Sequence, residues 1–206
     1  MERAREILSR LEYGENIPDP ELDQLFPKPF RAASENHWTS VQAAKRAVEL
    51  LVDRPRMRIL DVGSGVGKFC LVGALTSTAY FTGVEQRASL VRVAQRMVDR
   101  FSIPRIEFWN ARIQDIDWRP FHGFYFFNPF VENFYRPSER IDATVELSPL
   151  RYRKDLRFVQ HQLGLARGGT RVVTYHGLGG AFPPEYRLVT QEPMGEDFLQ
   201  LWVKDG

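Results

Sequence analysis

Three glycines at alternate positions, Gly63, Gly65 and Gly67, follow an apolar stretch that contains Asp61 and precede a second apolar stretch of helical length. This pattern predicts a buried strand, a tight turn and a helix, because glycine reaches the positive φ that such a turn needs. A dinucleotide site would read G-x-G-x-x-G and a P-loop would read G-x-x-x-x-G-K-(S/T), and neither is present. We therefore expect a chain built from strand–turn–helix units, with a ligand at this turn.

Short apolar runs alternate with helical patterns along the rest of the chain. The patterns predict helices over residues 2–12, 41–52, 68–76, 87–101 and 149–166, and strands over residues 57–62, 79–84, 105–109, 122–127, 170–176, 186–190 and 198–203. Strands that alternate with helices indicate an α/β fold with a mostly parallel, Rossmann-like sheet and helices on both faces. The last two strands have no helix between them, which favours a C-terminal antiparallel hairpin around a Pro-Met-Gly-Glu turn.

A length of 206 residues favours one domain with at most a small appendage. Residues 1–36 hold one short helical pattern and a stretch rich in Gly, Pro and Asn, so we expect an N-terminal helical extension or lid there. Residues 37–206 would form the ligand-binding domain. The formal net charge of +2 falls short of the surplus that is typical of a dedicated nucleic-acid binder.

Several classes of protein are made less probable by the composition. The single cysteine, Cys70, excludes a disulfide framework and a multi-cysteine zinc site, and the four histidines show no ligand spacing, so no metal is expected. No apolar run approaches the ~18 residues of a membrane span, and the charged N-terminus shows no signal peptide. We expect a cytoplasmic protein without a membrane partner.

Later landmarks fit the glycine turn. Glu85 lies at the end of the second expected strand, Asn110 ends the third and is followed by Ala111, and Asn128-Pro129-Phe130 lies at the end of the fourth. With these positions, about residues 37–203 resemble the class I S-adenosylmethionine-dependent methyltransferases.

The resemblance implies a cofactor, S-adenosyl-L-methionine, and a set of residues that bind it. The cofactor would lie over the turn, and the acid at the end of the second strand would hold the two ribose hydroxyls through charge-assisted hydrogen bonds. Asn110 and Ala111 stand where the family has Asp-Ala at the adenine amino group, with Asp115 as a second candidate. Thr39, in a His37-Trp38-Thr39 run before a helix, would bind the carboxylate of the cofactor. The expected cofactor-binding residues are Thr39, Asp61, Gly63, Ser64, Gly65, Gly67, Glu85, Gln86, Asn110, Ala111 and Asn128.

The expected catalytic residues are Asn128, Pro129, Phe130 and His176. The first three are similar to the (N/D)-P-P-(Y/F) motif of amino-group methyltransferases, without the second proline. The Gly-Ser-Gly-Val-Gly turn and this motif also resemble those of the non-SET histone lysine methyltransferases. A bacterial methyltransferase family shares the Trp-Thr pair and the Thr-Tyr-His-Gly-Leu-Gly-Gly segment that contains His176, which could act as a base. The resemblance implies transfer of a methyl group to a nitrogen of a protein side chain or small molecule.

Three other functions remain open at this point. The Asn-Pro-Phe motif and the basic isoelectric point of about 8.8 are also compatible with a nucleic-acid base methyltransferase. A non-catalytic domain that binds the cofactor is a second alternative, and a nicotinamide-dependent oxidoreductase is a third that the glycine spacing disfavours. Lys68 is expected to be a solvated residue at the start of a helix, and Cys70 to be inert core packing.

Overall fold

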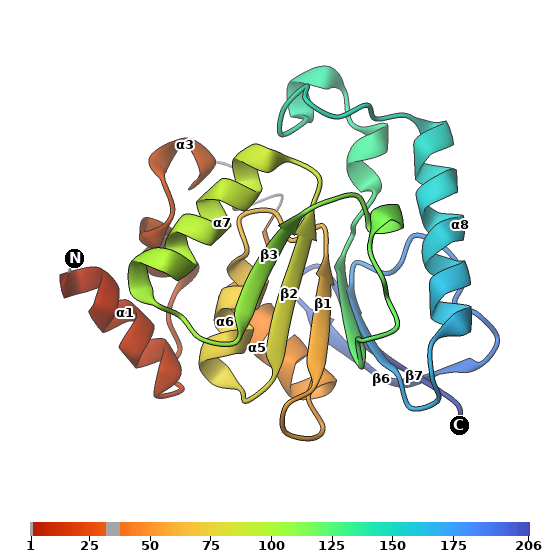
Figure 1. Ribbon diagram of the computed structural model, residues 1–206, viewed down its shortest axis with the longest axis horizontal. Helices are drawn as coiled ribbons and strands as arrows, with labels where there is room; N and C mark the ends of the chain where they lie inside the picture. Colours follow the sequence, from red (N-terminus) through yellow and green to blue (C-terminus); the bar gives the residue numbers. More distant parts are fainter. Residues whose placement is uncertain (1, 32–37) are drawn as a thin grey trace.

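The computed structural model describes residues 2–31 and 38–206. A seven-stranded sheet forms its centre, in the order β3-β2-β1-β4-β5-β7-β6 (Figure 1). The strands are β1 Arg58–Val62, β2 Tyr80–Glu85, β3 Ile106–Asn110, β4 Gly123–Phe127, β5 Arg171–Tyr175, β6 Tyr186–Met194 and β7 Asp197–Lys204. The first five strands pair in parallel, and β7 pairs antiparallel with β5 and with β6. The expected α/β class and the C-terminal antiparallel hairpin are both confirmed.

Helices cover both faces of this sheet. The α-helices are α1 Glu2–Glu12, α2 Asp19–Leu22, α3 Lys28–Arg31, α5 Val41–Leu51, α6 Lys68–Thr76, α7 Ala88–Phe101 and α8 Pro149–Leu165, and short 3-10 helices are η1 Asp23–Leu25, η2 Ile113–Asp115, η3 Val131–Phe134 and η4 Pro137–Glu139. Helices α5, α6 and α7 bury their apolar faces in one core with α1, while α8 packs into a second core on the other face. In Figure 1, α7 and α8 therefore stand on different sides of the molecule.

The N-terminal segment is packed onto the domain. Ile7, Leu11 and Leu22 are buried in the same core as α6. Lys68, the first residue of α6, is only 3% exposed because its ammonium lies between Asp19 and Asp23 of this segment. The expectation of a solvated Lys68 is thus wrong. The expected boundary at residues 36 and 37 lies outside the described residues, so the division into extension and domain stays a prediction.

The C-terminal hairpin differs from expectation in one respect. Strand β6 continues to Met194, four residues beyond the expected end, and pairs Pro193 with Phe198. Because β6 is the edge strand, Pro193 has no second neighbour to which its missing N–H would have to donate. The turn then lies at Gly195, where φ is +58°.

Candidate functional site

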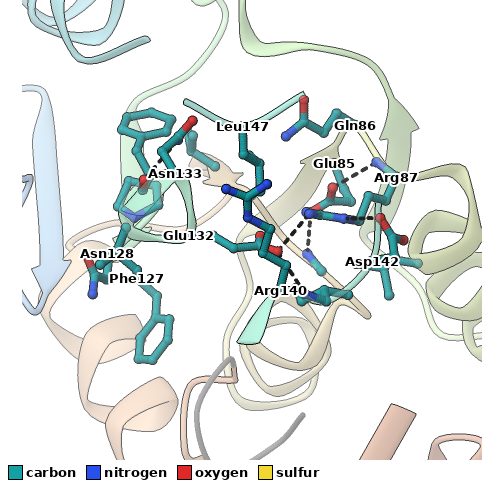
Figure 2. A pocket seen from close by; sticks show the side chains of 18 of the residues that line it. Glu85, Gln86, Arg87, Phe127, Asn128, Glu132, Asn133, Arg140, Asp142 and Leu147 are labelled. Carbon is teal, nitrogen blue, oxygen red and sulfur yellow. Dashed lines mark hydrogen bonds and ion pairs between the residues drawn. The ribbon is translucent and has the colours of Figure 1, made fainter. Parts of the chain in front are cut away.

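A cavity of about 820 Å³ opens beyond the carboxyl ends of the parallel strands. Strand β1 lies between β2 and β4, so the winding of the sheet reverses beside it, which is where ligands bind in open α/β sheets. The lining includes the residues that follow β1, β2, β3 and β4. Figure 2 shows Asn128 and Phe127 on one side of this cavity, with Glu85, Gln86 and Arg87 on the other.

The glycine turn supplies a bare stretch of backbone to the cavity wall. Gly63 and Gly65 both have positive φ, line the cavity and would find nothing within 4 Å of an added Cβ. Gly67 serves a different purpose, because it caps α6 in a left-handed conformation and a Cβ there would lie 2.3 Å from the ring of Phe108. Two of the glycines therefore allow a ligand to approach closely, and the third allows the helix to pack on β3.

Glu85 ends β2 with its carboxylate held by the backbone. Its Oε1 accepts from the Arg87 N–H at 2.8 Å and its Oε2 accepts from the Gly65 N–H at 3.3 Å. Burial raises the pKa of Glu85, and these two hydrogen bonds and the Arg87 charge oppose that rise. Because each carboxylate oxygen has more than one acceptor direction, the group can still accept hydrogen bonds from a ligand in the cavity.

Arg87 forms a clamp that the sequence analysis missed. Its guanidinium donates to Glu132 at 2.9 Å and to Asp142 at 3.0 Å, so it joins the end of β2 to the segment after β4 (Figure 2). The three side chains line the cavity. Glu132 and Asp142 lie 45 and 55 residues after Arg87 in the chain, so no local sequence pattern indicates that the three side chains meet.

Asn110 ends β3 but does not line the cavity, whereas Ala111 does. The Asn110 Nδ2 donates to the carbonyls of Glu85 and Gln86, each at 3.0 Å. The amide nitrogen therefore fixes the loop after β2, which leaves Oδ1 as the side-chain acceptor. Asp115 is 61% exposed and also lies outside the cavity lining.

A second, much smaller pocket of about 20 Å³ adjoins the turn. It is lined by Thr39, Asp61 and Ser64 among others, whereas His37 lies outside the described residues. The Thr39 hydroxyl is 2.9 Å from the Tyr125 hydroxyl, and Ser40 rather than Thr39 caps α5. Most of the expected cofactor-binding residues thus line one of two pockets that share Gly63, whereas Gly67 and Asn110 line neither.

Asp61 lines this pocket and is only 4% exposed. Burial raises its pKa to about 7, the charge of Glu85 adds to the rise, and a hydrogen bond from the Cys70 thiol opposes it. The Cys70 Sγ donates to Asp61 Oδ2 at 3.3 Å. Cys70 is buried as expected, but it also has this polar partner.

The expected catalytic residues gather at the ends of β4 and β5, and all four line the cavity. Asn128 has φ of +39° and His176 has φ of +63°, although neither is glycine. The Asn128 N–H donates to the Tyr175 carbonyl at 3.1 Å, which holds the two strand ends together. Such backbone strain persists only where surrounding contacts enforce it, and it often marks functional sites.

His176 is oriented by Asp197, a residue that the sequence analysis missed. The distance from His176 Nδ1 to Asp197 Oδ2 is 2.8 Å. An ionised carboxylate can only accept, so in the neutral form of the imidazole this contact places the proton on Nδ1 and leaves Nε2 as the acceptor. Asp197 lies directly after the C-terminal turn, 21 residues from the histidine, so only the strand pairing brings the two together.

The described residues 2–31 and 38–206 contain no group of three or more His, Cys, Asp or Glu side chains that could hold a metal ion. In the same ranges, no helix has both the length and the apolarity needed to cross a membrane. The cavity lining includes backbone, carboxylates, guanidinium groups, amides, and aromatic and aliphatic side chains.

Comparison with known proteins gives matches in structure alone. No family model and no curated protein sequence matches the chain. An RNA methyltransferase from Salinibacter ruber, solved in complex with S-adenosyl-L-homocysteine, has a TM-score of 0.56 and 18% identity over 80% of this chain and 91% of that one. TrmN from Thermus thermophilus has a TM-score of 0.62 and 19% identity over 85% of this chain, which spans about half (52%) of that protein. An rRNA methylase from Streptococcus thermophilus has a TM-score of 0.51 and 11% identity over 80% of this chain and 95% of that one.

These likenesses establish the fold. The chain has the Rossmann-like fold of class I S-adenosylmethionine-dependent methyltransferases. At identities below 20% they carry no information on the substrate, because one fold serves many functions. The resemblance to the histone lysine methyltransferases stays a prediction.

Proposed function

We propose that the chain is an S-adenosylmethionine-dependent methyltransferase that transfers a methyl group to a nitrogen atom. One observation carries the proposal: the buried Glu85 carboxylate and the bare backbone of Gly63 and Gly65 face the same cavity. A volume of about 820 Å³ lies within the range of cofactor and substrate pockets. The Salinibacter ruber structure with bound S-adenosyl-L-homocysteine supports the choice of cofactor.

The residues present fit such a cofactor. Glu85 would accept from the ribose hydroxyls, and Ala111 and the Asn110 Oδ1 would lie toward the adenine. The glycine turn would meet the middle of the cofactor, and Thr39, Asp61 and Ser64 would lie toward its amino-acid end. The proposed contacts are those of the sequence analysis, except that Gly67 would act through the packing of α6: Thr39, Asp61, Gly63, Ser64, Gly65, Glu85, Gln86, Asn110, Ala111 and Asn128.

The acceptor would enter from the side of β4 and β5. S-adenosylmethionine supplies an activated methyl group when bound, so the protein has to place and deprotonate the acceptor. Asn128 would accept a hydrogen bond from an acceptor N–H, and Pro129 and Phe130 would form a wall that excludes water. In the neutral form of His176, Nε2 would remove a proton from a charged or weakly basic nitrogen.

Ligand-dependent thermal stability tests this proposal. S-adenosylmethionine or S-adenosylhomocysteine at ~100 times its dissociation constant should add ~2.7 kcal/mol of stability, and NAD(P) should add none. Tritiated methyl transfer into protein, nucleic-acid and small-molecule fractions of a lysate then identifies the acceptor. A shift with NAD(P) alone would contradict the proposal, and tight cofactor binding without transfer to any fraction would indicate a non-catalytic binding domain.

A further inference from the structure

The outer face of α8 carries a stripe of basic side chains. Arg153, Lys154, Arg157 and His161 are all exposed. At 3.6 residues per turn they fall within about 100° of arc and span about 12 Å along the helix. The opposite face of α8 is buried through Val159 and Leu163.

Among residues 2–31 and 38–206, no acidic side chain forms an ion pair with the Lys and Arg side chains of this stripe. Asp155, the one acid in α8, is buried and pairs with Arg151 at 2.9 Å. Within the described part of the chain, Arg153, Lys154 and Arg157 form no ion pair. Residues 149–167 hold five Lys and Arg against one Asp, whereas the whole chain holds 28 basic against 26 acidic residues. The small net charge therefore conceals a local concentration of positive charge.

The N-terminal end of α8 borders the cavity, and the aromatic rings of Tyr152 and Phe134 lie there. Arg151, in the first turn of α8, lines the cavity. Tyr152 packs edge-on against Phe130 of the cavity wall and against Phe134, with ring centroids 6.5 Å and 4.7 Å apart. Phe134 is 57% exposed, so a large apolar ring faces solvent beside the first turn of α8, and its chain neighbours Asn133 and Tyr135 line the cavity.

We propose that α8 and Phe134 form a docking surface for single-stranded nucleic acid, whose phosphates lie along Arg153, Lys154 and Arg157 and whose base stacks on Phe134 near the cavity. A row of cations beside an exposed aromatic ring is the combination that single-strand binders use. A base held there can reach the cavity without being extracted from a duplex. This inference rests on the proposed function and deepens it, because it assigns the acceptor nitrogen to a nucleobase.

Helix α7 provides a matched comparison on the other face of the sheet. Arg92, Arg96 and Arg100 are also exposed and also spaced by four residues. Their row includes the exposed Asp99, and Arg100 lies over the ring of Phe101. Neutralising three cations on either helix changes the net charge equally. Comparing the two triple variants therefore distinguishes docking of nucleic acid on α8 from long-range attraction of nucleic acid to the protein's net charge.

The test measures binding of a fluorescein-labelled single-stranded RNA of about 12 nucleotides, and of the same sequence as DNA, by anisotropy without cofactor. Three phosphate contacts predict that log K falls with log salt with a slope of about −2, which is about 20-fold between 50 and 200 mM salt. Arg153→Gln/Lys154→Gln/Arg157→Gln should remove most of that slope, and Arg92→Gln/Arg96→Gln/Arg100→Gln should leave it. Phe134→Leu should weaken binding roughly 5- to 150-fold and Phe134→Tyr should not.

Two results would overturn the inference. The first is that the protein binds neither RNA nor DNA, and binding of vesicles that contain phosphatidylserine or of a polyglutamate peptide would then show what the stripe binds instead. The second is that the α7 and α8 triple variants weaken binding equally. The RNA and DNA arms show which of the two is preferred. Because this assay contains no cofactor, RNA binding without a thermal shift by S-adenosylmethionine would contradict the proposed function alone, and the reverse would contradict this inference alone.

Discussion

The ammonium of Lys68 lies 2.6 Å from a carboxylate oxygen of Asp23. Lys68 is the first residue of α6, directly after the glycine turn, and Asp23 belongs to the N-terminal segment. The same ammonium is 2.6 Å from Asp19, whose Oδ1 also accepts from the Val41 N–H at the start of α5. One buried lysine thus ties the N-terminal segment to the loop that bounds the cavity.

Replacing Lys68 by methionine should therefore destabilise the protein and loosen this segment. Methionine keeps the length of the side chain but removes the charge that compensates the buried Asp23, and breaking a buried ion pair costs about 3 kcal/mol or more. Urea denaturation should show this loss. Limited proteolysis should cut residues 2–31 faster in the variant.

Lys45→Met is the matched control for that variant. Lys45 also reaches the N-terminal segment, where its ammonium donates to the Gly14 carbonyl at 2.8 Å, but the contact is exposed. Its loss should cost less than ~1 kcal/mol. Equal, small effects of the two substitutions would mean that the Lys68 ion pairs contribute little to docking.

The positions of the elements could be predicted because their patterns are local. The glycine turn, the alternation of strands and helices and the closing hairpin are each written within a few neighbouring residues, and the strand bounds differ mostly by one or two positions. Strand β6 was predicted too short because Pro193 indicates a turn unless the strand is known to lie at an edge.

Long-range partners could not be predicted in the same way. Nothing near Lys68 in the sequence indicates that Asp19 and Asp23 will cover it, and nothing near His176 indicates Asp197. The residues at strand ends, such as Glu85, could be predicted as one group because parallel strands bring their carboxyl ends to one edge. Contacts between side chains from distant segments depend on packing that periodicity does not encode.

Glu85→Gln should weaken cofactor binding by roughly 1.5–3 kcal/mol, because hydrogen bonds to a charged acceptor are stronger than those to a neutral one. Isothermal titration calorimetry with S-adenosylhomocysteine measures this directly. Glu107→Gln on β3 is the control, since that carboxylate accepts from Thr82 and lies away from the cavity. Unchanged affinity in the Glu85 variant would remove the ribose assignment.

Gly67→Ala should destabilise the fold by about 2–4 kcal/mol, because alanine is strained at φ of +82° and its Cβ would overlap the Phe108 ring. Gly164→Ala in α8 should instead stabilise by about 0.5–1 kcal/mol, since its Cβ would meet nothing within 4 Å. Chemical denaturation of the two variants gives both values. A loss in the Gly67 variant no larger than the ~1–2 kcal/mol of left-handed backbone strain would mean that the close approach to Phe108 is relieved without cost.

Asp197→Asn should lower the turnover number about 10- to 100-fold while leaving cofactor affinity unchanged. The expected loss arises because an amide no longer holds the imidazole proton on Nδ1, so Nε2 is not always free to accept a proton. Glu196→Gln removes the neighbouring charge without touching His176 and should have little effect. A parallel loss of cofactor affinity would place Asp197 in the binding site rather than behind a base.

Asp61→Asn should change how stability depends on pH. Burial raises the pKa of Asp61 to about 7, against about 3.9 in an unfolded chain, so the folded state binds a proton more tightly. The resulting stabilisation is fully present below pH ~4 and is lost as the pH rises to ~7, by up to about 4 kcal/mol. Asparagine resembles the protonated acid and can still accept from the Cys70 thiol, so the variant should gain stability relative to the wild type between pH 5 and 8.

Carboxylates with lowered pKa, such as Glu192, titrate alike in both proteins and cancel in the difference. Urea denaturation at several pH values provides the comparison. Parallel pH profiles of the wild type and the variant would show that Asp61 is ionised in the folded protein. A negative charge would then be buried next to the glycine turn.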